Sequence, residues 1–212
     1  HLTDIRERIT LNSQSVAKDS FAQSASVVLK IARGYKGSPY LSYFDVLTAI
    51  AFHAFMKEKM EWVVLETGLG GRADSTNVTE KELCVLTRVG LDHQEVLGSN
   101  LQEIAAEKIG ITRTEIPVIV AEQVPELKPW LAEQFRKTKV PAFFVDEIFA
   151  TDFPENNLSL KFSSKPQLAC IQTSLCAMQV LFNGDRLQQQ KWLEAAQRVQ
   201  IRGRLDLRQN VF

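Results

Sequence analysis

The sequence predicts an α/β fold in which helices flank a mostly parallel sheet. Four short runs are apolar or nearly so, which is typical of strands that are buried on both faces of a parallel sheet. Segments with helical periodicity lie between these runs, and this alternation favours right-handed crossover connections. The composition is that of a globular protein, with 212 residues, 45% of them hydrophobic and 24% charged. The four runs are residues 62–65, 84–87, 117–121 and 141–145.

Two helices and a short strand are predicted before the first apolar run. Residues 9–12 alternate apolar and polar, and residues 12–15 have the composition of a turn. Apolar residues then recur at three- and four-residue steps over residues 19–33, which predicts an amphipathic helix ended by Gly34. The same spacing predicts a second helix over residues 43–59.

Helices are also predicted after the second, third and fourth apolar runs. Residues 101–109 have helical spacing, with Gly110 as the C′ cap. The helix over 129–137 begins with proline in its first turn. Residues 152–164 have the composition of irregular or hairpin structure. Two more helices, 167–181 and 188–200, and an extended segment at 205–207 complete the prediction.

The bulk properties exclude several classes of protein. The formal net charge is zero and no block of Lys and Arg is present, so nucleic acid is not an expected partner. The longest uncharged apolar stretch, residues 46–56, is far shorter than the roughly 20 residues that span a bilayer. The three cysteines have no CxxC spacing, so we expect a protein of the reducing cytoplasm.

Two polar side chains follow the first two predicted strands. Glu66 comes directly after residues 62–65, and His93 follows residues 84–87 by a short loop. Ligands of parallel α/β sheets bind beyond the carboxyl ends of the strands. A carboxylate and an imidazole there, together with phosphate oxygens, would suit Mg²⁺. The spacing alone leaves open that Glu66 caps a loop and that His93 satisfies a backbone carbonyl.

Glycines and one lysine form a second set of candidates. Gly68 and Gly70 lie in a glycine-rich loop, where a missing side chain allows a ligand to approach the backbone closely. This loop is no P-loop, because no Lys-Ser/Thr pair follows its glycines. An ordinary tight turn is the alternative. Lys108 lies in the last turn of its predicted helix, where the alternative role is that of a cation facing the helix dipole.

Three stretches together resemble the motifs of one enzyme family. LETGLGGRADSTNV at residues 65–78 resembles the family pattern LEVGLGGRLDATNV. VGLDH at 89–93, followed by LG at 97–98, resembles IGLDH…LG, and IAAEKIGI at 104–111 resembles IAxEKAGI. The family is that of the folylpolyglutamate and dihydrofolate synthases, relatives of the Mur ligases. The resemblance is strong over residues 1–121 and thin afterwards.

The resemblance implies a role for each candidate residue. Glu66 and His93 match the family's Mg²⁺ ligands, and Lys108 matches a lysine that the family carries as an N-carboxylated side chain. A carbamate replaces the ammonium with an oxygen donor, which could hold a second Mg²⁺. Arg204 fits an arginine near the phosphates of ATP, and Gly68 and Gly70 are expected in the cofactor-binding loop.

The implied fold is a Mur-ligase-like P-loop ATPase domain that lacks its first βα unit. Residues 1–204 are expected to form this N-terminal domain, and residues 205–212 the beginning of the linker to a C-terminal domain. The family's GTNGKGS loop and DGAHNP motif do not occur in the 212 residues, so this chain alone is expected to be inactive. Cys170 stands where the family has an asparagine near the adenine.

The implied activity is ATP-dependent ligation of L-glutamate to folate or dihydropteroate through an acyl phosphate, by a monomeric enzyme. Two alternatives stay open: a Mur-type ligase with another carboxylate substrate, and a non-catalytic remnant that binds folate or a partner protein. A remnant would have no need of Glu66, His93 and Lys108 together, which favours a ligase. The sequence does not decide between one and two synthase activities, or between pteroate and folate as acceptor.

Overall fold

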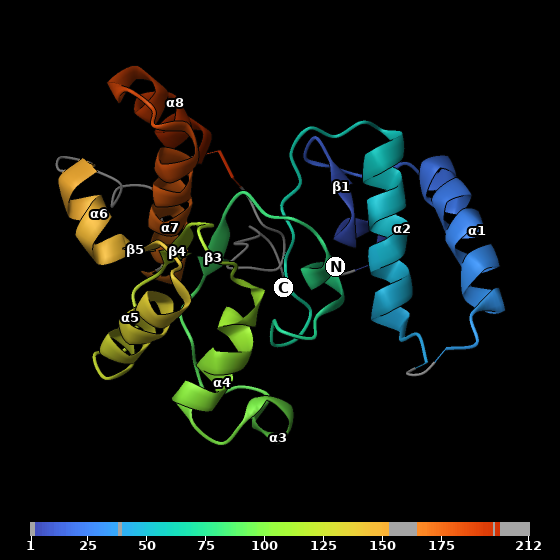
Figure 1. Cartoon of the computed structure of the whole chain (residues 1–212). Coiled ribbons are helices and arrows are strands. Elements are labelled where there is room, and N and C mark those ends of the chain that lie inside the picture. The colour runs from blue at the N-terminus through green and yellow to red at the C-terminus, as the bar shows by residue number, and fades with distance from the viewer. Residues whose placement is uncertain (1–2, 38–39, 153–164, 197, 200–212) are drawn as a thin grey trace, which may run out of the picture. The chain divides into compact units, whose positions relative to one another are not determined.

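The computed structural model describes residues 3–37, 40–152, 165–196 and 198–199 of the chain. The chain, drawn in Figure 1, divides into two compact units. The first unit takes in His1–Leu69 and Asp74–Val78. The second unit takes in Gly70–Ala73 and Thr79–Phe212.

The first unit consists of a small hairpin and two helices that pack against each other (Figure 1). A 3-10 helix, η1 (Ile5–Arg8), leads into the antiparallel strands β1 (Thr10–Leu11) and β2 (Gln14–Ser15). The helices are α1 (Lys18–Gly34) and α2 (Tyr43–Lys57). The predicted strand and two helices are therefore confirmed, with helix ends within two residues of those expected. The predicted turn is confirmed only at residues 12–13, because Gln14–Ser15 form β2, which was not expected. The buried core of this unit comprises Ile9, Val16, Leu47 and Ile50.

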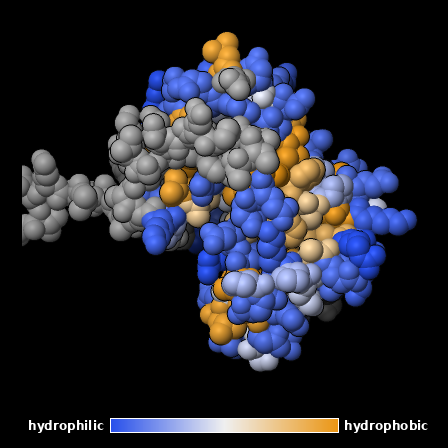
Figure 2. Space-filling model, turned by 90° about the vertical axis from the view of Figure 1, so that its left-hand side faces the viewer, coloured by the Kyte–Doolittle hydropathy of each residue, from blue (hydrophilic) through white to orange (hydrophobic). Residues whose placement is uncertain are grey.

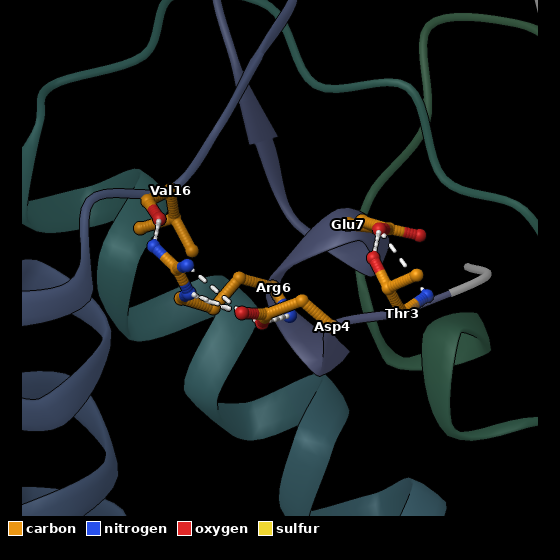
Figure 3. A network of polar contacts seen from close by, with 5 residues as sticks. All are labelled: Thr3, Asp4, Arg6, Glu7 and Val16. Carbon is orange, nitrogen blue, oxygen red and sulfur yellow. Dashed lines mark hydrogen bonds and ion pairs between the residues drawn. The ribbon is translucent and has the colours of Figure 1, made fainter. Parts of the chain in front are cut away.

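A polar network holds η1 against the segment that follows the hairpin (Figure 3). Asp4 caps η1 by accepting a hydrogen bond from the backbone N–H of Arg6 at 2.8 Å. The Arg6 guanidinium lies 2.8 Å from Asp4 Oδ2 and donates to the carbonyl oxygen of Val16 at 3.3 Å. Thr3 Oγ1 donates a hydrogen bond to Glu7 at 2.8 Å. This bond and those of Asp4 connect η1 to the residues that precede it.

The first turn of α2 is the best-capped helix start in this unit. Ser42 and Asp45 form a capping box, in which each side chain accepts a hydrogen bond from the other's backbone N–H. Asp45 Oδ1 also accepts a hydrogen bond from Ser75 Oγ at 2.5 Å. Ser75 begins the 3-10 helix η2 (Ser75–Val78), so the same carboxylate joins η2 to the start of α2.

Replacing Asp45 with asparagine should therefore give a pH-dependent loss of stability. The hydrogen bond from Ser75, followed by those from Ser42, holds the pKa of Asp45 below its ordinary value. This stabilisation is fully present above the pKa of the unfolded chain, about 3.9, and is lost as the pH falls through the folded-state value. We expect the Asp45→Asn change to lower the free energy of unfolding by about 1 kcal/mol at neutral pH.

Urea denaturation at neutral pH and well below the ordinary pKa of aspartate measures this difference, which should shrink in acid. The matched control is Asp19→Asn, which removes the same charge from the first turn of α1. In the described part of the chain Asp19 has no such hydrogen bonds, so its effect should be smaller. An Asp45→Asn difference that stays constant with pH would contradict the assignment.

The second unit contains the parallel sheet that the sequence predicts. Its strands pair in the order β3 (Cys84–Leu86), β4 (Val118–Val120), β5 (Ala142–Phe144), and both pairings are parallel. The predicted helices are confirmed as α4 (Leu101–Lys108), α5 (Leu127–Thr138), α7 (Lys165–Phe182) and α8 (Arg186–Ala196). Two further helices, α3 (Gln94–Leu97) and α6 (Val145–Asp152), were not expected from the sequence.

Both faces of the central strand are buried. Val118 and Val120 belong to one hydrophobic cluster, together with Ile104 of α4 and with Leu131 and Phe135 of α5. Ile119 points to the other face, into a cluster that includes Val145 and Cys176. All three residues of β4 are 0% exposed. This burial on two faces explains why the strand is a continuous apolar run instead of an alternating pattern.

The strand predicted at residues 62–65 is wrong. The structure assigns no strand there, and Trp62, Val63 and Val64 are 53%, 41% and 97% exposed. Apolar composition favours an extended and buried segment, but a strand also needs a neighbouring strand that shares its backbone hydrogen bonds. Among the described residues the parallel sheet contains only β3, β4 and β5. The expectation that Glu66 follows a strand of that sheet is therefore not met.

The predicted C′ cap at Gly110 is also wrong. Gly110 lies inside a 3-10 turn, η3 (Ile109–Ile111), and does not have the positive φ of such a cap. A Cβ atom on Gly110 would lie 2.5 Å from the Cβ of Arg72 and 2.8 Å from its Cα. The glycine is thus required by the close approach of another chain segment. The structures predicted for residues 152–164 and 205–207 fall almost wholly, or wholly, outside the described residues.

The surface mixes polar and apolar side chains, as Figure 2 shows for one face of the molecule. Among the described residues, no helix is both long enough and apolar enough to cross a membrane. Several large apolar side chains of the first unit are more than half exposed: Ile31, Tyr40, Tyr43, Met56, Trp62 and Val64.

Candidate functional site

A buried carboxylate organises the glycine-rich loop after Glu66. Asp74 is 9% exposed. Its Oδ2 accepts hydrogen bonds from the backbone N–H groups of Gly68 and Leu69 at 2.8 and 3.0 Å. Its Oδ1 accepts from the backbone N–H and the hydroxyl of Thr76 at 2.9 and 2.6 Å. The backbone on both sides of the loop is therefore fixed by one side chain.

Glu66 lies on the surface of the first unit, two residues before the backbone that Asp74 fixes. Its side chain is exposed, and within the described residues its carboxylate makes no hydrogen bond or ion pair. The alternative role of capping the loop therefore belongs to Asp74 and not to Glu66. An exposed carboxylate of this kind can accept a metal ion without first breaking an internal contact.

The predicted loop glycines are both closely packed. A Cβ atom on Gly68 would lie 2.7 Å from ring carbons of Phe44. Gly70 has φ +66°, which favours glycine, and a Cβ there would lie 2.8 Å from Leu97. Close packing therefore explains why glycine occupies each of these two positions. Contact of Gly68 and Gly70 with a nucleotide stays a prediction.

The segment after the glycines holds the C-terminal end of α4. The backbone N–H of Arg72 donates to the carbonyl oxygen of Glu107 at 3.0 Å. Its guanidinium donates to the carbonyl oxygen of Ala106 at 3.2 Å and to Glu107 Oε1 at 3.3 Å. Gly71 packs against the carbonyl oxygens of Glu107 and Lys108. The last turn of α4, which carries Lys108, is therefore held by backbone contacts.

Replacing Gly71 with alanine should test this close approach. The added Cβ would lie 2.5 Å from the carbonyl oxygen of Lys108 and 2.9 Å from that of Glu107, so backbone must move. We expect the free energy of unfolding to fall by about 1–3 kcal/mol. Gly90→Ala is the control, because the position of its Cβ has no atom within 4 Å. Equal unfolding midpoints for the two variants would contradict the packing described.

Lys108 is the last residue of α4 and is partly exposed. Within the described residues its ammonium makes no hydrogen bond or ion pair. The negative end of the helix dipole favours a cation at this position, so the unmodified side chain fits the alternative predicted for it.

His93 has a strained backbone and an exposed ring. It adopts the left-handed conformation at φ 51°, ψ 40°, which costs a residue with a side chain about 1–2 kcal/mol. Its backbone N–H donates to Asp92 Oδ1 at 2.9 Å. The imidazole nitrogens lie 3.7 Å from Asp92 Oδ2 and 3.8 Å from Glu95 Oε1, and the side chain is 53% exposed. Lys59 and Lys139 also have positive φ, so this conformation by itself does not mark a functional site.

The donor set of the predicted metal site is chemically suitable. Carboxylate and carbamate oxygens are the ligands that Mg²⁺ prefers, while an imidazole is unusual for it. Glu66 belongs to the first unit, and His93 and Lys108 belong to the second. Among the described residues no group of three or more His, Cys, Asp or Glu side chains could hold a metal ion. A metal shared by Glu66 and His93 therefore stays a prediction.

Arg204 and Cys170, which the resemblance places near the nucleotide, are not part of the geometry described above. Arg204 lies outside the described residues. Cys170 is exposed on α7. The residue missed by the sequence reasoning is Asp74, although it belongs to the same motif as Glu66. Its signal was an Asp-Ser-Thr sequence, because a short acidic side chain before hydroxyl residues commonly accepts hydrogen bonds from nearby backbone.

Comparison with known sequences gives one consistent result, although no model of a known protein family matches the chain. A putative folylpolyglutamate synthase of Caenorhabditis elegans is 34% identical over 72% of this chain and 30% of its own length. A dihydrofolate synthase/folylpolyglutamate synthase of Haemophilus influenzae is 31% identical over 85% of this chain and 42% of its own. The Buchnera aphidicola protein of the same name is 28% identical over the whole chain and 50% of its own length. The chain thus spans half or less of these relatives.

Comparison with solved structures agrees. The apo form of the L. casei synthase (FPGS) superposes with a TM-score of 0.63 at 28% identity, over 68% of this chain and 36% of that one. The E. coli FolC protein in complex with DHPP and ADP superposes with a TM-score of 0.60 at 33% identity, over 68% of this chain and 33% of that one. The parallel α/β architecture described above is therefore shared with these proteins.

Proposed function

This chain belongs to the folylpolyglutamate synthase/dihydrofolate synthase family, and from that premise we propose that it is part of an ATP-dependent ligase. The ligase joins L-glutamate to a folate-type carboxylate, either dihydropteroate or a folylpolyglutamate. The observation that carries this proposal is the occurrence, in one chain with family-level similarity, of Glu66, His93 and Lys108 in their three motifs. Arg72 supports it, because the loop that begins at Glu66 in the sequence continues into contacts beside Lys108.

In this proposal each residue has one task. Glu66 and His93 hold Mg²⁺ through a carboxylate oxygen and an imidazole nitrogen. Lys108, carboxylated on its side-chain nitrogen, presents oxygen to a second ion. When bound, the ions neutralise charge on the phosphate oxygens. Arg204 contributes positive charge near the same phosphates, and the backbone at Gly68 and Gly70 lines the nucleotide site.

The proposed reaction has two balanced steps. A carboxylate oxygen of the acceptor attacks the γ-phosphorus of ATP, the bond to the β-phosphate oxygen breaks, and ADP leaves. The amino nitrogen of glutamate then attacks the acyl carbon of the resulting acyl phosphate. The carbon–oxygen bond to phosphate breaks, inorganic phosphate leaves, and the nitrogen loses a proton. Because water would hydrolyse the acyl phosphate, the site must exclude water during the reaction.

The test is the substrate dependence of ADP release by the intact enzyme, the protein that contains these 212 residues. We expect ADP release to require both L-glutamate and a pteroate or folate acceptor. Release that depends on a different carboxylate would favour the Mur-type alternative. Binding of folate without any ADP release would favour the non-catalytic remnant.

We further propose that residues 1–204 form the ATPase domain without its P-loop unit, and that the 212 residues alone do not ligate. A P-loop supplies the backbone N–H cradle and the lysine that hold the β- and γ-phosphates, and no such loop occurs in this sequence. Glutamate-dependent ADP release by the 212-residue chain would contradict this. We place the enzyme in the cytoplasm as a monomer.

A further inference from the structure

We propose that Asp74 is a positioning residue that fixes the backbone beside Glu66 and so sets where this metal ligand lies. The inference rests on the proposed function, because it assumes that Glu66 binds the metal ion. An ionised carboxylate has about four acceptor positions, and Asp74 uses four, toward Gly68, Leu69 and twice toward Thr76. Its acceptor capacity is therefore filled by the protein itself.

Only a carboxylate fits the arrangement around Asp74. All four partners donate: three backbone N–H groups and one hydroxyl. In asparagine one of the two oxygens becomes an NH₂ group, which can only donate. Whichever way that amide turned, the NH₂ would face two N–H donors of the loop or the two donors of Thr76. Asp74→Asn therefore removes at least two hydrogen bonds while keeping the shape of the side chain.

The held loop is anchored on a regular helix. Ser75, the neighbour of Asp74, donates to Asp45 in the first turn of α2 at 2.5 Å. Gly68 rests on the ring of Phe44 in the same turn, where a Cβ atom would lie 2.7 Å from ring carbons. The glycine-rich loop thus has two contacts with the start of α2 in addition to its bonds with Asp74. Functional groups are placed more precisely when regular elements support them.

Glu66 itself has no comparable support. Within the described part of the chain its carboxylate has no hydrogen-bond partner. The location of Glu66 therefore depends on its own backbone. That backbone lies two residues before Gly68, whose N–H group donates a hydrogen bond to Asp74. Residues that orient a metal ligand commonly change metal affinity or activity by about 10- to 100-fold when they are mutated. We expect Asp74 to act in this way through the backbone.

Amide hydrogen exchange in the Asp74→Asn variant tests the positioning directly and needs no metal or substrate. Exchange should be faster by about tenfold at Gly68 and Leu69 when the NH₂ group faces the loop, or at the backbone N–H of Thr76 when it faces Thr76, because those N–H groups lose their acceptor. In the intact enzyme the Mg²⁺ concentration for half-maximal rate should rise by about tenfold or more. The kcat at saturating Mg²⁺ should fall less. A merely structural role would lower the unfolding midpoint without changing the Mg²⁺ requirement.

Three further variants make the test decisive. Asp146→Asn is the control, because it removes an aspartate that pairs with Lys128 in the second unit, and it should leave the exchange and the Mg²⁺ requirement unchanged. Thr76→Val removes only the hydroxyl bond to Asp74 and should give an intermediate increase in exchange, which serves if Asp74→Asn does not fold. Thr76→Ser should restore normal behaviour.

The failure of this inference can be separated from that of the proposed function. If Glu66→Ala keeps a normal Mg²⁺ requirement, Glu66 is no metal ligand and the proposed metal site fails. If Glu66→Ala loses activity while Asp74→Asn keeps a normal Mg²⁺ requirement and normal exchange at Gly68, Leu69 and Thr76, the positioning role of Asp74 is overturned.

Discussion

Replacing Lys108 with alanine is expected to abolish turnover in the intact enzyme while leaving its fold unchanged. If the lysine carries a carbamate, the variant lacks the oxygen donor that counters positive charge at the phosphates. Losses of a single such electrostatic group typically cost about 10²- to 10³-fold in kcat. The ammonium makes no hydrogen bond or ion pair within the described residues, so truncating the side chain should cost well under about 1 kcal/mol of stability.

Lys108→Arg is the matched control for charge. It keeps a cation at the end of α4, as the helix dipole prefers, but a guanidinium cannot replace the carbamate. Both variants should therefore be inactive, and both should unfold like the wild type. Short carboxylic acids added to Lys108→Ala should partly restore activity by supplying the missing oxygens. Near-normal turnover of either variant would show that a carbamate on Lys108 is not needed for the reaction.

Replacing Glu66 with alanine is the second change with a large expected effect. We expect the rate at limiting Mg²⁺ to fall by about 10²-fold or more, because one of few protein ligands to the ion is lost. Raising the concentration of Mg²⁺ should recover part of the rate. Glu66 has no hydrogen bond within the described residues, so the unfolding midpoint should not move.

The control for this change is Glu61→Ala, which removes an exposed glutamate from the same surface segment of the chain. It should keep the wild-type dependence on Mg²⁺. A Glu66→Ala enzyme that behaves like Glu61→Ala would show that Glu66 is not a metal ligand, and the metal site would then rest on His93 and Lys108.

The sheet could be predicted because its strands are short apolar runs, and the central one is buried on both faces. Residues 84–87, 117–121 and 141–145 are apolar runs that become β3, β4 and β5, and β4 is wholly buried. Residues 62–65 have the same composition and form no strand, since composition does not encode which segments pair. Helix α3 was missed because four residues carry too little periodicity. Helix α6 was missed because it begins at Val145, inside the apolar run that was assigned to the fourth strand.

The reactive side chains of the candidate site could be predicted from the sequence, but the contacts that hold them in place could not. Glu66, His93 and Lys108 were found through motifs, since reactive side chains are read directly from the sequence. The hydrogen bonds of Asp74 and the packing of Gly71 against Lys108 depend on contacts between chain segments. Gly110 illustrates the same limit, because a glycine is required there by the close approach of Arg72 and not by the helix end beside it.

The most direct test of the proposed ligase follows one oxygen atom. The acceptor carboxylate is labelled with heavy oxygen and incubated with ATP, Mg²⁺, L-glutamate and the intact enzyme, and the products are analysed by mass spectrometry. Passage through an acyl phosphate predicts that one labelled oxygen appears in inorganic phosphate for each glutamyl amide formed. Unlabelled phosphate alongside the amide would contradict the acyl phosphate, and release of ADP and phosphate without any glutamyl product would contradict glutamate ligation itself.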